Sequence, residues 1–449
     1  MFIERGSFTF KNSTHFRISL VIFIFIVTIH LPWVDFSGIA LPDTKGYLDV
    51  SANWFTSEHI YIRPIVYPIF LFFAKLIKPN EFGVIVYIQI FFYALSAVIF
   101  YKLLIYRKIK INKYTLLFFV IISFSAPQAL YFNQIVLPET LPLFFILLLI
   151  HFLLQPASFK NSLIITFLII LPILLKPLWL LLMLFPLLKF IYSEKNRSNL
   201  IFGFLFPTLL TIILYSTNQF AVAKSEKNTV TASTFDMNTN LSLIRMGMID
   251  ADKNSRLLEL LKHKKLIVEV SNRTWDNSNK EFLRFTEIKD QIPSSYREDS
   301  SFWKSILLKK PNNLLQYVSF QISRVPAFFS TSAANYKVKF FPNILNRMYQ
   351  SFFYNIHAKH IAGICFLLFT FIIGLFNFKI WTLHKIFFFL IIGVTTVICL
   401  LVYQNPHFLR MRAVIEPLIL YITLYTLFKT FEYLKTVTSF KLKKNHNTK

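Results

Sequence analysis

The sequence predicts an all-α polytopic membrane protein with about ten membrane-spanning helices. Hydrophobic residues make up 55% of the 449 residues, and charged residues make up only 16%. Soluble globular chains average about 25% charged residues, so this composition indicates an integral membrane protein. A membrane span needs roughly 17 to 25 mostly apolar residues. The candidate spans lie near residues 18–34, 82–105, 114–130, 137–154, 162–176, 178–192, 199–217, 361–378, 385–403 and 411–428.

Basic segments orient these spans, because cytoplasmic loops of membrane proteins carry an excess of Lys and Arg. Four such segments fall on one side when the spans are counted in order: 107–113, 193–197, 379–385 and 441–444. We therefore expect that side, and both termini, to be cytoplasmic. The first apolar run exceeds the roughly 7–15 residues of a signal-peptide core, and further spans follow it, so an uncleaved anchor is favoured over a cleaved signal peptide.

The net charge of +26 does not indicate a nucleic-acid-binding protein. The basic residues are scattered among the spans instead of forming one patch, and basic cytoplasmic loops explain them. The two cysteines, Cys365 and Cys399, each lie within an apolar run, which argues against a disulfide or a thiolate metal site. The sequence contains no Gly-rich phosphate loop, no internal repeat and no metal-ligand spacing.

The chain divides into four regions by composition. They are an N-terminal transmembrane module (1–217), a small extracytoplasmic α-rich domain (218–360), C-terminal spans (361–430) and a basic cytoplasmic tail (431–449). Within the first outer loop, 35–81, the apolar piece 64–77 is too short to cross and predicts a juxtamembrane or re-entrant helix. The amphipathic, aromatic residues 314–356 are typical of helices that lie along the membrane surface.

The first outer loop carries the leading candidate for chemistry, Asp43. A helical face follows it, formed by Tyr47, Val50, Ser51 and Trp54. Asp is a favoured N-cap residue, so Asp43 can simply cap this helix. A capping carboxylate can also be held rigidly where an acceptor hydroxyl arrives, as a general base requires. Asp35 and Asp49 compete for that role in the same loop.

A second carboxylate, Glu139, opens the fourth predicted span. A charge that enters hydrocarbon is costly, so ionisable residues there are functional candidates. The alternative is a first-turn acid that faces the helix dipole, after Pro138 as the helix starter. The sequence leaves these two interpretations open.

Four cations are expected at the outer surface, against the positive-inside bias. They are Arg63, Lys176, Arg410 and Arg412. Lys176 can snorkel to lipid headgroups, and the two late arginines can anchor the last span at the interface. An anionic lipid phosphate would suit all four, since Arg binds phosphate with two hydrogen bonds. We expect them to gather around one cavity.

These motifs resemble the GT-C superfamily of membrane glycosyltransferases, in particular the protein O-mannosyltransferases and the lipid A aminoarabinose transferase. The resemblance rests on Asp43 with Tyr47, on Arg63-Pro64-Ile65-Val66-Tyr67-Pro68, on Leu137-Pro138-Glu139-Thr140-Leu141, and on the segment from Arg410 to Pro417. The segment 302–312, before the late spans, is also similar to the family. Many members carry two adjacent acids in the first loop, whereas Thr44 follows Asp43 here, and the use of a divalent metal stays open.

The resemblance implies an enzyme of the bacterial cytoplasmic (inner) membrane that works on the outer face. It implies inverting transfer of a sugar from a polyprenyl-phosphate donor to a glycan, lipid or protein acceptor. Asp43 would be the base and Glu139 a second catalytic acid. The four outer cations would stabilise the departing phosphate, and the substrate would contact Tyr47, Tyr67 and Asp49.

Two other functions stay open from the sequence. An O-antigen polymerase or ligase also uses outer-face arginines on lipid-linked glycans, but it has no need of Asp43. A transporter or flippase would show repeated halves and charges at mid-membrane, whereas this chain shows no repeat and keeps its charges at one surface. No nucleic-acid partner is expected.

Overall fold

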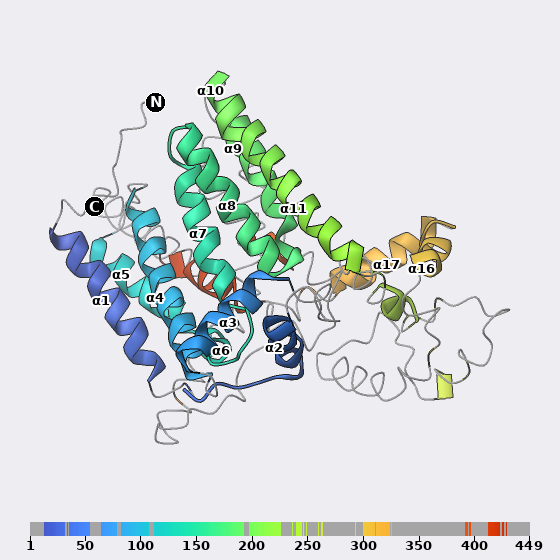
Figure 1. The fold of residues 1–449 in the computed structure, drawn as a ribbon, viewed down its shortest axis with the longest axis horizontal. Helices are drawn as coiled ribbons and strands as arrows, with labels where there is room; N and C mark the ends of the chain where they lie inside the picture. The colour runs from blue at the N-terminus through green and yellow to red at the C-terminus, as the bar shows by residue number, and fades with distance from the viewer. Residues whose placement is uncertain are drawn as a thin grey trace, which may run out of the picture.

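The computed structural model describes a helical chain (Figure 1). The described residues are 13–31, 34, 36–53, 64–78, 82–106, 112–192, 197–225, 236, 239–244, 246, 248, 259, 262, 263, 292, 300–309, 311–323, 325, 348, 391–393, 395, 396, 412–422, 424, 425 and 428. Within these residues the only extended pairing is a parallel bridge between Ile39 and Ile135. The all-α fold class predicted from the sequence is therefore confirmed.

Two long apolar helices begin the bundle. Helix α1 (Ser13–His30) packs antiparallel to α4 (Gly83–Tyr106). The Phe23 and Phe91 rings meet edge to face at 5.7 Å, and the Tyr101 hydroxyl lies 3.5 Å from His15 Nδ1. Both helices are apolar all round, as expected of helices that face either a core or lipid.

Nine further helical segments continue the bundle, of which η2 runs directly into α9, and α10, η3 and α11 follow one another without a break. They are α5 (Lys113–Phe124), α6 (Pro127–Asn133), α7 (Leu141–Leu153), α8 (Phe159–Leu175), the 3₁₀ helix η2 (Pro177–Leu184), α9 (Phe185–Tyr192), α10 (Arg197–Leu200), the π-helix η3 (Ile201–Leu205) and α11 (Phe206–Ser225). Side-chain caps start two of them. Asn112 accepts a hydrogen bond from Tyr114 N at the start of α5, and Ser158 accepts one from Asn161 N at the start of α8.

Several predicted spans are shorter or divided in the structure. The run 114–130 is broken into α5 and α6, because Pro127 starts a new helix and keeps the preceding residue out of the helical conformation. By length and composition, two described helices could cross a membrane, Gly83–Ile105 and Arg197–Thr217, and six other apolar helices have 10–17 residues. The predicted span 361–378 lies outside the described residues, as does most of 385–403.

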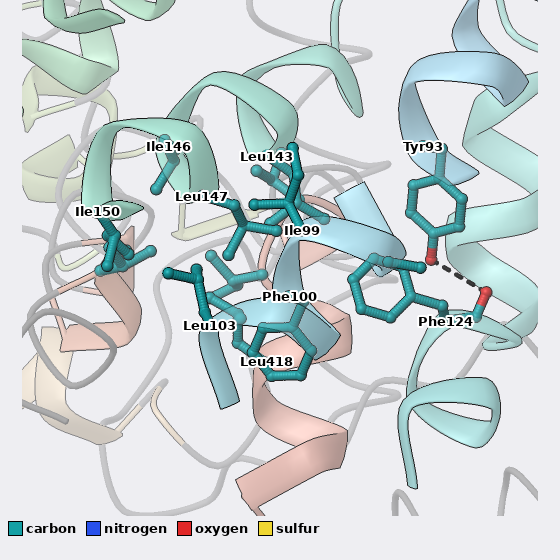
Figure 2. Packing of buried hydrophobic residues seen from close by; sticks show 14 of the residues in the cluster. Tyr93, Ile99, Phe100, Leu103, Phe124, Leu143, Ile146, Leu147, Ile150 and Leu418 are labelled. Atoms are coloured by element: carbon teal, nitrogen blue, oxygen red, sulfur yellow. Dashed lines mark hydrogen bonds between the residues drawn. The ribbon is translucent and has the colours of Figure 1, made fainter. Parts of the chain in front are cut away.

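A large apolar core joins α1, α4, α5, α7 and α8 to the late segment 412–422 (Figure 2). Ile99 and Leu103 of α4 lie among Leu143, Leu147 and Ile150 of α7, while Leu418 packs from the late segment. The Tyr93 hydroxyl donates to the backbone oxygen of Phe124 at 3.2 Å and ties α4 to the end of α5. Residues more than 300 positions apart in the sequence therefore share one core.

The outer faces of the same helices are also apolar. Large hydrophobic side chains are more than half exposed on several of them: Ile24 (54%), Phe118 (58%), Phe167 (58%) and Ile213 (59%). In the continuous helix Arg197–Thr217, which includes the first part of α11, 17% of the most apolar 18 residues are buried, against 61% in Gly83–Ile105.

A separate, smaller cluster lies in the predicted extracytoplasmic domain. Helices α16 (Ser300–Leu307) and α17 (Pro311–Ser323) pack around Leu307 and Tyr317, together with Leu243. The indole of Trp303 donates to Asp236 Oδ1 at 2.7 Å. Helix α16 overlaps the segment 302–312, and α17 overlaps the segment 314–356 in which the sequence predicted helices.

Candidate functional site

The motifs singled out in the sequence come together at one end of the bundle. We call it the α2 end, after α2 (Pro42–Asn53), which lies there with α3 (Val66–Ile77) and α6, at the bottom of Figure 1. One buried cluster contains Tyr47 of α2, Tyr67 of α3, residues 135–137, Leu175 and Ala413. Leu175 and Ala413 are the chain neighbours of Lys176 and Arg412, so five separate segments of the chain meet at this cluster.

Residues 36–41, which we call the strap, hold α2 against the segment that leads to Glu139. Ile39 N donates to Gln134 O at 2.9 Å, and Val136 N donates to Ile39 O at 3.0 Å. The Thr44 hydroxyl then donates to Val136 O at 3.1 Å. Helix α2 is therefore fixed to residues 134–140 by backbone as well as by side-chain contacts.

Asp43 lies in the first turn of α2 and is half-buried. The helix begins at Pro42, so the interpretation of Asp43 as the N-cap is wrong. Thr44 does the capping instead, because its hydroxyl accepts a hydrogen bond from Leu41 N at 2.9 Å. A negative charge in the first turn of a helix is favoured by the helix dipole.

The predicted buried face of α2 is confirmed for three of its residues. Tyr47, Val50 and Ser51 are each at most 2% exposed, and Trp54 lies outside the described residues. Asp49 lies on the half-buried side of the helix, and its Oδ1 accepts a hydrogen bond from Asn53 Nδ2 at 2.6 Å.

Tyr67 links α2 and α3 to the interior. Its ring meets Tyr47 edge to face at 5.1 Å, and its hydroxyl donates to Gln89 Oε1 at 2.9 Å. Burial, with smaller contributions from Tyr47 and Glu139, raises the pKa of Tyr67 well above its ordinary value. Tyr67 therefore stays a hydrogen-bond donor close to a carboxylate.

Gln89 is the centre of a buried polar network that sequence reasoning missed. Its Nε2 donates to Asn133 O at 2.8 Å and to Ile135 O at 2.9 Å. The Asn133 amide donates to His30 Nε2 at 3.0 Å, and His30 Nδ1 lies 2.5 Å from Ile26 O. This pattern makes His30 a donor at Nδ1 and an acceptor at Nε2. A Gln within an apolar helix was the only signal in the sequence.

Glu139 and Lys176 form a buried ion pair. The Glu139 side chain is fully buried and that of Lys176 is 10% exposed. Helix α7 begins at Leu141, so the interpretation of Glu139 as a first-turn acid is wrong. The snorkelling interpretation of Lys176 is also wrong, because its amine meets a buried carboxylate instead of a headgroup.

Local sequence explains the position of Lys176. It separates α8 from η2 and has extended backbone angles, φ −154° and ψ 121°. Pro177 enforces this conformation, since the residue before a proline is excluded from the helical region. The bend directs the lysine at the segment that carries Glu139.

Arg412 and Glu416 form a second buried ion pair. Arg412 Nε lies 2.7 Å from Glu416 Oε2, and both side chains are 0% exposed. The interpretation of Arg412 as a surface anchor is therefore wrong. Arg63, Arg410 and Asp35 lie outside the described residues.

Among the residues that the structure describes, no group of three or more His, Cys, Asp or Glu side chains could hold a metal ion. Comparison with known protein families, curated proteins and solved structures gave no match to this chain. The chemistry of the site therefore has to be argued from its own residues.

The site offers carboxylates of two kinds. Glu139 is fully buried and has an ammonium as its partner, which favours the ionised form and makes it a counter-ion. Asp43 is only half-buried, at the start of a helix packed on the same cluster. Of the two predicted catalytic acids, Asp43 is the better placed to meet an incoming hydroxyl.

Proposed function

We propose that the chain is a polytopic membrane glycosyltransferase that moves a sugar from a polyprenyl-phosphate carrier to an acceptor hydroxyl on the outer face of the bacterial cytoplasmic membrane. The observation that carries the proposal is the convergence of Asp43, Tyr67, Glu139, Lys176 and Arg412 at one end of the bundle. These residues come from five places in the chain, and the motifs around them are the ones that resemble GT-C enzymes.

A membrane setting is supported by the surface of the bundle. Apolar side chains cover the outer faces of α1, α5, α8 and α11, where a soluble protein would place polar ones. The irregular backbone of residues 134–140 is buried within the protein, and Gln89 donates to the carbonyl groups of Asn133 and Ile135 there. Non-helical backbone at membrane depth is tolerated under that condition.

In the proposed reaction the acceptor hydroxyl oxygen attacks the anomeric carbon. Its proton goes to Asp43, the bond between that carbon and the phosphate oxygen breaks, and the electron pair leaves with the lipid phosphate. The configuration at the anomeric carbon inverts. Asp43 is held for this role by the strap and by the Thr44 cap.

The two ion pairs give the departing phosphate fixed cations. An ammonium has three N–H donors and a guanidinium has five, so each cation can bind its carboxylate and a phosphate oxygen together. The phosphate charge rises from −1 in the diester to about −2 after the sugar leaves. Preorganised cations therefore favour the departing state over the bound donor, which raises the rate more than the affinity.

Mass spectrometry of surface glycans from a deletion strain tests the function. Loss of one sugar from an envelope glycan, lipid or protein is expected, with restoration by the wild-type chain but not by Asp43→Asn. Unchanged glycans would contradict the proposal. Restoration by Asp43→Asn would instead indicate a polymerase or ligase that needs no carboxylate in the first loop.

A further inference from the structure

We propose that helix α17 docks on an anionic lipid surface through one exposed apolar face, with the turn before the helix at the lipid headgroups. We call this face the α17 face; it consists of Leu314, Leu315, Val318 and Ile322. Helix α17 is drawn in orange at the right of Figure 1. The proposal depends on the membrane setting of the chain but not on the proposed sugar transfer.

Contacts with α16 determine which side of α17 faces outward. Tyr317 and Phe320 are at most 4% exposed, and Tyr317 belongs to the same buried cluster as Leu307 of α16. Asn313 Nδ2 donates to Ile306 O at 2.9 Å and joins the start of α17 to α16. These contacts fix the rotation of α17 about its own axis, so the opposite side of the helix is turned away from the cluster.

The outward side of α17 is apolar. Leu314, Val318 and Ile322 follow one another at intervals of four residues, and their exposed fractions are 45%, 44% and 63%. Leu315 is 67% exposed. At about 100° per residue, these four side chains occupy an arc of about 100° on the helix. The exposed polar residues of α17 form a separate strip beside this arc: Asn312, Gln316 and Ser319.

This arrangement differs from that of an ordinary surface helix. Such a helix has one apolar stripe, which faces the core, and polar residues on the opposite side. Helix α17 has a buried apolar face, an exposed apolar face and a polar strip between them. An exposed contiguous apolar face marks a place of contact with another protein or with a membrane.

The turn before α17 favours a lipid surface as the partner. Leu308 is 72% exposed, and Lys309 beside it is exposed as well. The segment 300–323 contains three lysines and no Asp or Glu. An apolar helical face bordered by lysines is typical of helices that lie in the membrane surface, where the lysines meet anionic headgroups.

The acids near this segment contact or adjoin α16 well before the turn. Glu298 and Asp299 precede α16 in the sequence, and the eight residues of α16 span about 12 Å, which exceeds the Debye length at physiological salt. Asp236 accepts the hydrogen bond of the Trp303 indole, six residues before Lys309. The charge of Lys309 is therefore complementary to an anionic lipid surface.

A moderate apolar contact is sufficient for this docking. In the proposed membrane setting, the bundle already holds α17 close to the bilayer. The docking is then an intramolecular event with a high effective concentration, so it needs less binding free energy than recruitment of a soluble protein.

The test uses the full chain in nanodiscs of phosphatidylglycerol and phosphatidylcholine, which leave both membrane faces open to a quencher. In a background with Cys365→Ala and Cys399→Ala, single cysteines carry an environment-sensitive fluorophore. At Leu315→Cys and Ile322→Cys we expect blue-shifted emission, quenching by spin-labelled lipid and loss of quenching by iodide. Gln316→Cys is the matched control on the polar strip of the same helix, and iodide should quench it.

Iodide quenching at the two α17-face positions equal to that at Gln316→Cys would overturn the proposal. Protection of both positions from iodide and from spin-labelled lipid would overturn it as well, because protein would then cover the face, whether from this chain or from a second copy.

Lys309→Gln tests the headgroup contact, with the fluorophore at Ile322→Cys. In nanodiscs with phosphatidylglycerol it should lower the ratio of docked to undocked helix about fivefold, as expected for one lysine near an anionic surface. In nanodiscs of phosphatidylcholine alone it should have no effect. Equal effects in the two lipids would overturn the headgroup contact of the turn. Lys113→Gln, an exposed lysine outside α16 and α17, is the control and should change neither ratio.

Discussion

At the residue scale, the two buried ion pairs carry the largest consequences. A charge taken out of water is stabilised only by its partner, and removal of one member of a buried pair typically costs about 3–5 kcal/mol. Glu139 with Lys176 joins the segment before α7 to the end of α8. Arg412 with Glu416 closes one turn of the late segment. These residues therefore influence folding as well as any reaction.

Single substitutions in the first pair should destabilise the chain more than the double substitution. We expect Glu139→Gln and Lys176→Met each to lower the free energy of unfolding by about 3–5 kcal/mol, because each leaves one buried charge unpaired. Glu139→Gln/Lys176→Met should recover a large part of that loss. Denaturant unfolding in detergent measures all three variants. Single effects under about 0.5 kcal/mol would show that the pair is not buried in the native protein.

Gln89 should matter more for stability than its partner Tyr67. Gln89→Leu removes the acceptor of the Tyr67 hydroxyl and the side-chain donor to the carbonyl oxygen of Asn133, whereas Ile135 O keeps its hydrogen bond from Leu137 N. Unsatisfied buried polar groups cost about 1–3 kcal/mol each. Tyr67→Phe removes one hydroxyl and should cost only about 1 kcal/mol. Thermal unfolding of both variants decides the order, and a larger effect of Tyr67→Phe would contradict the network.

The charged residues of the site could be identified as candidates from the sequence, whereas the neutral residues of the site could not. Asp43, Glu139, Lys176 and Arg412 stand out because ionisable groups are rare in an apolar chain. The pairing of Glu139 with Lys176 was not predictable, since it depends on where Pro177 ends α8 and on where α7 begins. Gln89, Asn133 and His30 resemble ordinary polar residues until the backbone carbonyl groups that they satisfy are known.

At the element scale, the strap before α2 depends on two glycines. Gly38 has a φ of +79°, which L side chains rarely adopt, and an added Cβ would lie 2.6 Å from Phe82 Cβ. A Cβ at Gly83 would lie 2.7 Å from the backbone oxygen of Phe36. The strap and the start of α4 therefore approach each other more closely than any other residue type allows.

Gly38→Ala should destabilise the chain by about 1–3 kcal/mol, because it adds a strained backbone and a steric clash. Gly393→Ala is the matched control, since nothing lies within 4 Å of its added Cβ and the residue is helical. The control should be neutral or should stabilise the chain by up to about 1 kcal/mol. Equal melting temperatures for the two variants would contradict the close approach at the strap.

The hydropathy of the sequence does not predict where the helices begin and end. The apolar run 114–130 reads as one span, but Ser125 and Pro127 divide it into α5 and α6. The segment 64–77, predicted as a juxtamembrane or re-entrant helix, forms helix α3, which begins two residues after Pro64. Apolar composition predicts that a helix exists, whereas its ends are set by proline, caps and tertiary contacts.

At the scale of the whole molecule, the carboxylates described between residues 13 and 225 gather in one region. Asp43 and Asp49 lie on α2, and Glu139 lies in the segment 134–140 to which the strap joins α2. The sequence could not predict which spans touch, because helices that are apolar all round give no preferred face.

Cysteine labelling tests the orientation. In a background with Cys365→Ala and Cys399→Ala, Ser305→Cys on α16 should react with a membrane-impermeant reagent in intact cells. Ser198→Cys on α10 should react only after permeabilisation. Both residues are exposed, so accessibility within the protein is comparable. The reverse pattern would place the Asp43 site in the cytoplasm and remove the argument for a lipid-linked donor.

The most direct test of the central claim is sugar transfer by purified Asp43→Asn. The substitution keeps the shape of the side chain but removes its negative charge and its ability to take a proton. Lys45→Gln is the control, since it removes an exposed charge from the same helix. With a polyprenyl-phosphate sugar donor, Asp43→Asn should lower kcat by about 10²–10⁴-fold, as expected for loss of a general base, with an unchanged melting temperature. Lys45→Gln should keep wild-type activity. Transfer by Asp43→Asn at close to the wild-type rate would contradict the account.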